Sequence, residues 1–215
     1  MMNSIQVPLV KFENQDMDTV LELKGARFHV QCVNWPETFP YAPLCSGRIA
    51  RTRDALVVDF RVSGLDLRIQ NTADNGRQWE DSCVEVFIQD PSKAVYYNFE
   101  VNPLGKVLAC SGPDRQNRVA RPAREMEQIL RFVCHPEEPQ ATKDLQGVQS
   151  WRVGVVIPFR LIGVDPENLP HSLRANFYKC GDKTAHPHYL SWSPIHTEKP
   201  DFHRPEFFGE LILGL

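Results

Sequence analysis

Long apolar runs and concentrations of one charge are both missing from this sequence. Its 215 residues include 24 Lys and Arg against 27 Asp and Glu, which gives a net charge of −3. No block of like charges predicts a surface for nucleic acid or anionic lipid, and no apolar run is long enough to span a membrane. Residues 1–8 also lack the basic start and apolar segment of a secretory signal. We therefore expect no nucleic-acid or membrane partner and, from the sequence as it stands, a cytoplasmic location.

Motifs of several enzyme and metal-site classes are missing as well. The six cysteines are dispersed and form no C-x-x-C pair, which argues against a zinc ribbon or a thioredoxin-like site and favours reduced, structural thiols. The sequence contains no G-x-S-x-G elbow, P-loop or G-x-G-x-x-G fingerprint. No repeat, low-complexity tract or linker divides the chain, so we expect residues 1–215 to form one domain.

Helical periodicity is weak, whereas strand signals recur along the chain. Short apolar or alternating segments are separated by most of the 17 prolines and 12 glycines. Segment 122–132 fits a short helix or a strand equally well, and segment 159–162 fits a single helical turn. This pattern predicts an all-β fold, a single antiparallel β-sandwich with jelly-roll or Greek-key connections and little helix. The clearest expected strands cover residues 56–62, 151–157, 174–180 and 207–213.

The most informative stretch joins two alternating segments, residues 82–88 and 96–102, through a short Asp-Pro turn. If both apolar faces point into one core, Glu85 lies nearly opposite Glu100 on the other face. Like charges opposed in this way are unfavourable, so a sheet that keeps them indicates a polar recognition surface, which Trp79 flanks as an aromatic wall. The apolar face comprises Val84, Val86, Ile88, Tyr97, Phe99 and Val101, and the polar face also carries Tyr96, Asn98 and Asn102.

A combination of four segments adds a family resemblance to this pattern. The segments are Trp79 with residues 81–88, residues 97–105, residues 175–180, and residues 192–194 with 201–209. Together they resemble the family 9 carbohydrate-binding modules, and more closely the family-9-like sugar-binding domains of bacterial polysaccharide-use systems. The resemblance implies a β-sandwich that holds a sugar, often at a chain end, in a slot between two tryptophans. Members of the family are often exported.

The resemblance also implies which residues contact the sugar. Trp79 precedes Glu85 by six residues, as in the family, and the polar positions two apart on the next strand are Glu100 and Asn102. Glu100 replaces the basic residue that the family usually carries there. Trp192 corresponds to the second wall, with an inner-strand asparagine as a further contact. Some relatives bind structural calcium, but no acidic loop marks such a site here, so no cofactor is expected. The expected ligand-binding residues are Trp79, Glu85, Glu100, Asn102, Asn176 and Trp192.

These residue types suit a sugar on physical grounds. Flat indole rings bury the apolar C–H face of a pyranose with little loss of side-chain freedom. Carboxylates and amides bond the hydroxyls, at about 1.5–3 kcal/mol for a hydrogen bond to a charged group before solvent competition. Two walls and a few such bonds predict micromolar to millimolar affinity. The expected partners are a mono- or oligosaccharide and a separate glycoside hydrolase, in polysaccharide catabolism.

Other interpretations of the same residues stay open. Trp151 lies among valines and is expected in the core, whereas Trp35 beside a proline has no assigned place. Glu85 and Glu100 could pair with arginines across the sheet. As carboxyls on opposed strands they also suit a retaining glycoside hydrolase, which needs its two carboxyls about 5–5.5 Å apart.

Histidine and methionine suggest two further sites with less support. His186 and His188 are two residues apart, but Pro187 favours a loop, and no acid or cysteine completes a metal-ligand set. A haem-binding sandwich needs a methionine and a histidine as axial ligands, and Met126 is the only methionine well inside the chain. His203 is expected to order the last loop, at the rim of the slot. Our main hypothesis is therefore non-catalytic carbohydrate binding.

Overall fold

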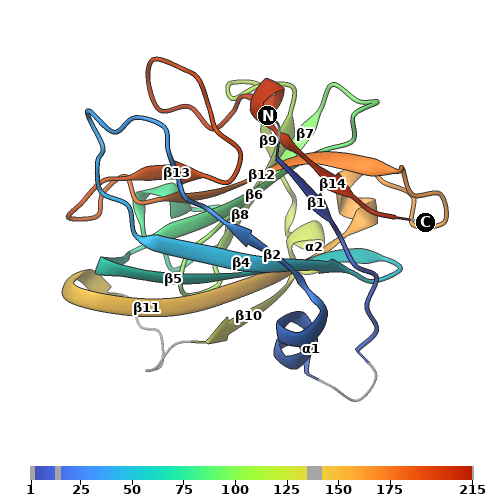
Figure 1. Cartoon of the computed structure of the whole chain (residues 1–215), viewed down its shortest axis with the longest axis horizontal. Helices are drawn as coiled ribbons and strands as arrows, with labels where there is room; N and C mark the ends of the chain where they lie inside the picture. The colour runs from blue at the N-terminus through green and yellow to red at the C-terminus, as the bar shows by residue number, and fades with distance from the viewer. Residues whose placement is uncertain (1–2, 13–15, 135–141, 215) are drawn as a thin grey trace.

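A computed structural model describes residues 3–12, 16–134 and 142–214. Within this part of the chain, two β-sheets face each other and enclose the main hydrophobic core (Figure 1). The strands of the five-stranded sheet are, in spatial order, β10 (Leu130–Cys134), β11 (Thr142–Pro158), β5 (Ala55–Ile69), β4 (Leu44–Arg51) and β2 (Ala26–His29). All its neighbouring strands pair antiparallel.

The nine-stranded sheet forms the opposite layer. Its main path is β1 (Ser4–Gln6), β14 (Gly209–Ile212), β12 (Ser172–Cys180), β6 (Cys83–Gln89), β7 (Tyr96–Val101), β8 (Val107–Gly112) and β9 (Val119–Ala120), with β13 (Tyr189–Ser191) and β3 (Cys32–Val33) attached beside β12. Pairing is antiparallel except between β1 and β14, which run parallel. The predicted all-β sandwich is therefore confirmed, and each expected strand coincides with or overlaps a strand of the structure.

Helices are few and short among the described residues. They are α1 (Met17–Lys24), η1 (Gln78–Glu80), α2 (Ala123–Met126), η2 (Phe159–Ile162) and η3 (Pro205–Phe207). The expected turn at 159–162 is confirmed as η2, and the ambiguous segment 122–132 divides between α2 and the start of β10. Helix α1 was not expected from the sequence; Asp16 caps it by accepting a hydrogen bond from the Thr19 N–H at 2.8 Å. None of these helices is long and apolar enough to cross a membrane.

The alternation of β6 and β7 determines which side chains enter the core between the sheets. Val84, Val86 and Phe99 are buried there, as the register predicts. Across the core, Phe28 of β2 stacks on Phe177 of β12 with ring centroids 4.1 Å apart. Because the strand period is two, the residues between these apolar positions point to the outer face of the nine-stranded sheet.

That outer face is covered in part by a second apolar cluster, which we call the outer cluster. The chain between β13 and β14 passes over it (Figure 1) and contributes rings such as Phe202. Trp35 is buried in this cluster, whereas Trp151 is buried between the sheets, as expected. The buried members are Trp35, Cys83, Phe87, Tyr96, Tyr178, Cys180, Ile195, Phe202 and Phe208.

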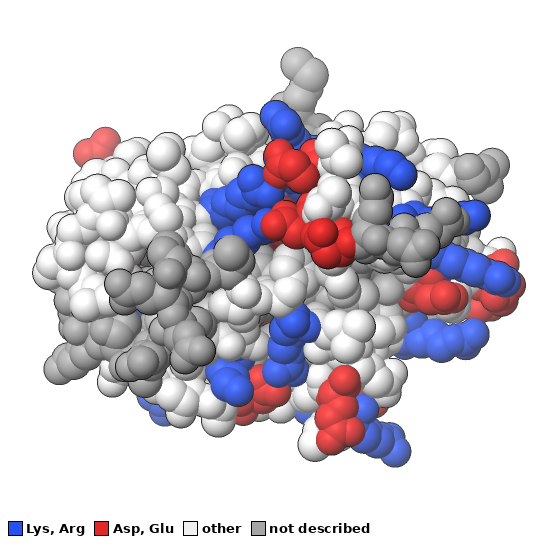
Figure 2. Space-filling view, turned by 90° about the horizontal axis from the view of Figure 1, so that it is seen from below, with Lys and Arg blue, Asp and Glu red and all other residues white. Residues whose placement is uncertain are grey.

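The opposite side of the molecule carries a mixed-charge surface. Figure 2, seen from below, shows acidic and basic side chains side by side. A hollow of about 760 Å³ over β5 and β11 is bordered by such ion pairs: Arg61 meets Glu22 at 2.5 Å, and Arg152 pairs with Asp18 and Asp59. Its charged side chains are therefore already paired with one another.

Candidate functional site

A pocket of about 370 Å³ opens on the outer face of the nine-stranded sheet, beside the outer cluster. We call it the site pocket. Glu85 of β6, Glu100 of β7 and Cys180 of β12 come from three adjacent strands and form its floor. Loops on either side supply the walls and rim. The remaining lining residues are Phe39, Trp79, Arg115, Arg118, Asp182, Tyr189, Pro200, Asp201, Phe202 and His203.

The two floor carboxyls lie directly opposite each other in the β6–β7 register, as predicted, and each is only 3% exposed. Glu100 Oε1 accepts hydrogen bonds from Asn98 Nδ2 at 3.0 Å and from Arg118 Nη1 at 3.5 Å. Its other oxygen, Oε2, is buried and has no donor among the described residues. Glu85 Oε1 accepts from the Cys180 thiol at 3.0 Å. The floor thus presents acceptors that the protein satisfies incompletely.

Burial of this pair changes its ionisation. Desolvation raises the pKa of Glu100 to about 7, against the opposing effect of the Arg118 guanidinium. Desolvation and then the charge of Glu100 raise the pKa of Glu85 well above its ordinary value. The two groups titrate as a coupled pair, so near neutral pH the floor holds a proton that a cation or a donor can replace.

Aromatic rings form the walls of the site pocket. Trp79 projects from η1 and is partly exposed. Three other rings form a connected group, because Phe39 meets Tyr189 edge-on with centroids 4.8 Å apart, and Tyr189 meets Phe202 at 6.1 Å. Phe202 also stacks on the buried Tyr178 at 4.1 Å. These contacts hold the rings in place before any ligand arrives.

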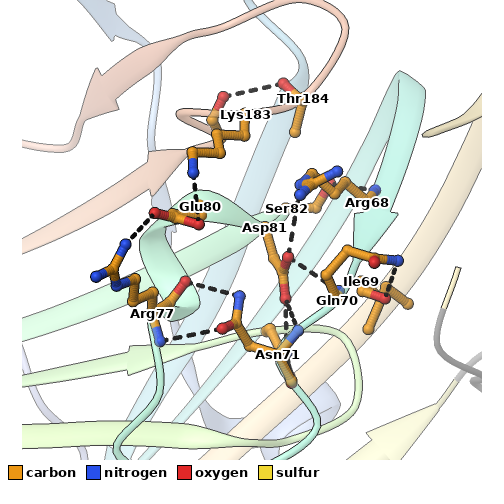
Figure 3. A network of polar contacts seen from close by, with 12 residues as sticks. Arg68, Ile69, Gln70, Asn71, Arg77, Glu80, Asp81, Ser82, Lys183 and Thr184 are labelled. Carbon is orange, nitrogen blue, oxygen red and sulfur yellow. Dashed lines mark hydrogen bonds and ion pairs between the residues drawn. The ribbon is translucent and has the colours of Figure 1, made fainter. Parts of the chain in front are cut away.

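A polar network holds the turn that carries Trp79 (Figure 3). The buried Asp81 carboxylate accepts hydrogen bonds from the backbone N–H of Gln70 at 3.0 Å and of Asn71 at 2.9 Å. Beside it, Glu80 pairs with Lys183 at 3.0 Å. This network ties η1 to the end of β5 on one side and to the loop after β12 on the other.

Charged groups surround the mouth of the site pocket. Burial raises the pKa of Asp182 to about 6, and its backbone N–H donates to Trp79 O at 3.0 Å. Burial lowers the pKa of His203 to about 3, so its ring is neutral at physiological pH, and its Nδ1 lies 2.8 Å from Tyr96 Oη. The charged side chains at the mouth are therefore the arginines and aspartates, and the histidine is neutral.

Three of the six residues predicted for the site lie together in the pocket, namely Trp79, Glu85 and Glu100. Asn102 and Asn176 do not line it. Asn102 Nδ2 instead donates to the Asn71 carbonyl at 2.7 Å, and its Oδ1 accepts two backbone N–H groups in the β7–β8 turn. The Asn176 side chain bonds the backbone of Ser193 in both directions, at 2.8 and 3.0 Å. Both amides thus organise the backbone near the site.

Trp192 also lies outside the lining of the site pocket. It is 6% exposed and packs between the sheets, with its ring centroid 5.4 Å from that of Phe177. The structure instead gives the pocket Phe39, Tyr189 and Phe202, which the sequence analysis did not single out. The sequence held a signal for part of this wall, because the loop around His203 was expected at the rim of the slot and that loop lines the pocket.

One group of side chains has the composition of a metal site. Ligand atoms of Cys83, Glu85 and Cys180 all lie within 4.8 Å of one another, and all three residues are buried. Burial raises the pKa of Cys83 to about 12 and that of Cys180 well above its ordinary value, so both are neutral thiols at physiological pH. An ion would have to displace both thiol protons before these residues could hold it.

The histidine pair makes other contacts. His188 Nε2 lies 2.7 Å from Lys179 Nζ, and His188 Nδ1 lies 2.7 Å from the His186 carbonyl. Both ring nitrogens of His188 therefore already have partners.

Comparison with solved structures finds the same fold in three other structures. A candidate carbohydrate-binding protein from Bacteroides uniformis aligns with a TM-score of 0.87 and 32% identity, over 99% of this chain and 100% of that chain. A family 9 carbohydrate-binding module from Caldicellulosiruptor kristjanssonii, in complex with glucose, aligns with a TM-score of 0.59 and 11% identity, over 99% and 97% of the two chains. A second structure of such a module from that organism, in complex with cellotriose, has the same TM-score of 0.59 and 11% identity, over 99% and 94%.

At 11% identity, the likeness to the Caldicellulosiruptor module shows the fold alone. Among proteins with curated descriptions, none matches this chain significantly. The family assignment comes from the sequence itself, because the sequence model of carbohydrate-binding family 9 matches residues 15–213. This match confirms the resemblance drawn from the four segments. The chain belongs to carbohydrate-binding family 9.

Proposed function

We propose that this protein binds a mono- or oligosaccharide in the site pocket without hydrolysing it. The observation that carries the proposal is the convergence of Trp79, Glu85 and Glu100 on one open pocket that aromatic rings also line. The Caldicellulosiruptor modules in complex with glucose and cellotriose support a sugar as the ligand class. The protein would then serve polysaccharide catabolism, with a separate glycoside hydrolase acting on the same polymer.

The pocket offers a role to each kind of side chain. Trp79 stacks on one apolar face of the pyranose, and the ring group that includes Tyr189 and Phe202 contacts the other. This ring group replaces the second tryptophan that the family resemblance implied. Glu85 and the unpartnered Oε2 of Glu100 accept hydrogen bonds from sugar hydroxyls.

Binding suits the geometry of the carboxyl pair better than hydrolysis does. A glycosidase places its acid and its second carboxylate on either side of the scissile bond. Here Glu85 and Glu100 are cross-strand neighbours on one floor, so both meet a bound sugar from the same side. This arrangement supports binding rather than hydrolysis.

Calorimetric titration of the purified protein with glucose, cellobiose and cellotriose tests the proposal. We expect dissociation constants between about 1 µM and 1 mM, which correspond to about 4–8 kcal/mol. Trp79→Ala should weaken binding at least about tenfold, because a stacked ring contributes about 0.5–1.5 kcal/mol beyond the area it buries.

A matched control is Phe12→Ala, which removes a partly buried ring from the α1 side of the molecule. It should leave sugar affinity unchanged. Equal binding by the Trp79→Ala variant, with its melting temperature preserved, would reject the site. Release of nitrophenol from nitrophenyl glycosides by the wild-type protein, abolished in Glu85→Gln, would instead establish hydrolysis.

A further inference from the structure

The floor of the site pocket lacks hydrogen-bond donors for its two carboxyls. Glu100 Oε2 is buried without a donor among the described residues, although Glu100 is 3% exposed and lines the pocket. The donor that the described residues give Glu85 is the Cys180 thiol, which is a weak one. A buried carboxylate oxygen without a donor costs more than about 1–3 kcal/mol. A ligand that brings donors to this point removes that cost.

Among the described residues of the lining, no positively charged side chain pairs directly with Glu85. Arg118 lies 3.5 Å from Glu100, but among the described residues no Lys, Arg or His nitrogen lies within 4.0 Å of a Glu85 oxygen. The acidic side chains of the lining outnumber the basic ones by four to two, and His203 is neutral. The acidic members are Glu85, Glu100, Asp182 and Asp201, and the basic members are Arg115 and Arg118.

From these two observations we infer that the site pocket selects a sugar with a free ammonium group, such as a hexosamine, and seats that group between Glu85 and Glu100. The inference rests on the proposed sugar-binding function and names its ligand class. An ammonium supplies three donors and one positive charge, whereas a sugar hydroxyl supplies one donor and no charge. Charge-assisted hydrogen bonds are about twice as strong as neutral ones.

Opposed carboxyls on neighbouring strands suit an ammonium for a geometric reason. Directly paired residues have Cβ atoms about 4.5–5.5 Å apart, so one small cation can reach both carboxyls at once. The bound charge takes the place of the proton that the pair holds near neutral pH. Arg118 pairs directly with Glu100 and leaves the side of Glu85 to the ligand. N-acetylation removes the charge and two of the donors and adds bulk over the same floor.

The test is calorimetric titration at neutral pH with four related ligands: glucosamine, glucose, N-acetylglucosamine and glucuronate. We expect glucosamine to bind at least about tenfold more tightly than glucose, a difference of about 1.4 kcal/mol. The other two ligands should bind no better than glucose. The preference should decrease as salt is added, because charge pairs near a surface are screened.

Glu85→Gln and Glu100→Gln should each reduce the glucosamine-to-glucose ratio to less than about threefold, since an amide keeps the shape but not the charge. The matched control is Glu167→Gln, an exposed acid that pairs with Arg53 and is not among the lining residues, which should leave the ratio unchanged. A thermal melt of each variant tests whether that variant is folded.

The outcomes separate this inference from the proposed function. Equal or tighter binding of glucose than of glucosamine overturns the inference and leaves sugar binding intact. Tighter binding of glucuronate overturns it as well and would assign recognition to Arg115 and Arg118. Absence of detectable binding for all four sugars overturns both this inference and the proposed function. Equal binding of ethanolamine, an amine without a ring, would show that the rings contribute nothing and would reject the sugar site.

Discussion

Glu100 occupies a buried position on the pocket floor, and its ionisation there affects stability as well as binding. Its pKa is raised from 4.5 in the unfolded chain to about 7 in the folded protein, chiefly by desolvation. A raised folded-state pKa means that the folded state binds the proton more tightly. The contribution of Glu100 to the free energy of unfolding is therefore fully present below the unfolded pKa and is lost as pH rises through the folded pKa.

Glu100→Gln should remove that loss. We expect the free energy of unfolding of the variant to increase relative to wild type as pH rises from about 5 to about 8, by up to about 3 kcal/mol. Urea unfolding of both proteins across this pH range gives the difference. Glu85 is present in both proteins, but its pKa is less raised in the variant because the charge of Glu100 is gone, and this change adds to the gain in stability as pH rises. The raised pKa of Asp182 and the lowered pKa of His203 are present in both proteins and largely cancel. A difference that is constant with pH would show that Glu100 is ionised throughout.

At the scale of single residues, the sequence predicts which face of a strand a side chain occupies better than it predicts which distant residues that side chain contacts. The strand alternation was enough to place Glu85 opposite Glu100 and to send Val84 and Phe99 into the core. Trp192 could not be placed in this way. It follows β13 outside regular alternation, so its burial depends on which sheet the loop packs against, and that is a tertiary property.

Asp81 connects two elements, the end of β5 and the turn η1. Its carboxylate accepts from the backbone N–H of Gln70 and Asn71 (Figure 3). It also accepts from Asn102 Nδ2 at 3.1 Å. Asp81→Ala removes the acceptor from these donors, of which the two backbone N–H groups are only partly buried and the Asn102 amide keeps the Asn71 carbonyl as a second acceptor. We expect a loss of about 2–4 kcal/mol in the free energy of unfolding, at about 1–2 kcal/mol for each of the two partly buried N–H groups, and weaker sugar binding through Trp79.

Urea unfolding and sugar titration of the Asp81→Ala variant measure the two effects. Asp165→Ala is the control, because Asp165 also accepts a backbone N–H, from Glu167 at 3.1 Å, but in an exposed turn. It should cost less than about 1 kcal/mol. Equal losses in the two variants would show that burial of the Asp81 network has no special weight.

Gly47 is a point of close approach between neighbouring atoms within the five-stranded sheet. A Cβ at this position would lie 2.2 Å from Asp59 O and 2.3 Å from Phe28 Cζ. Phe28 cannot move freely because it stacks on Phe177 across the core. Gly47→Ala should therefore lower the free energy of unfolding by about 1–3 kcal/mol or more.

The control for this substitution is Gly76→Ala, where the nearest atoms would lie 3.3 Å from the new Cβ. We expect it to change stability by less than about 1 kcal/mol. Chemical unfolding of both variants measures the contrast. A Gly47→Ala protein as stable as wild type would mean that the backbone of Asp59 and the ring of Phe28 can shift away from the new Cβ without loss of stability.

At the scale of elements, the long alternating strands were predictable and the short helices were not. The 15-residue β5 and the 9-residue β12 repeat the strand pattern several times. By contrast, α1 has eight residues and buries only Val20 and Leu21, too few to produce a helical period. The local signals that could have indicated it are the Asp16 cap, Asp18 in the first turn and Lys24 in the last turn.

At the scale of the whole molecule, the sandwich and its family were predictable, whereas its connections were not. The strand order β12-β6-β7 brings residues far apart in sequence, such as Cys180 and Glu85, onto one floor. That order depends on pairings between distant strands, which a periodic pattern does not specify. The aromatic wall depends on distant segments in the same way, since Phe39 and Phe202 both reach Tyr189 only after the loops have folded over the sheet.

Trp192 provides a test of how the two sheets hold together. Its ring is packed so closely that a Cβ on Gly209 would lie 2.5 Å from it, and it contacts Phe177 in the centre of the sandwich. Trp192→Phe should leave a cavity between the sheets and lower the free energy of unfolding by about 1–3 kcal/mol. The folded variant should bind sugar as the wild type does, because the side chain lies outside the pocket lining.

Trp79→Phe makes the complementary change, since it shortens a partly exposed ring on the pocket wall. It should reduce sugar affinity while altering stability by less than about 1 kcal/mol. Guanidinium unfolding and sugar titration give a free energy of unfolding and a dissociation constant for each variant. Together these values show which tryptophan belongs to the pocket wall and which to the core. If Trp192→Phe lost affinity at unchanged stability, the second tryptophan would belong to the binding site, and the loop after β13 would have to open toward the pocket when sugar binds.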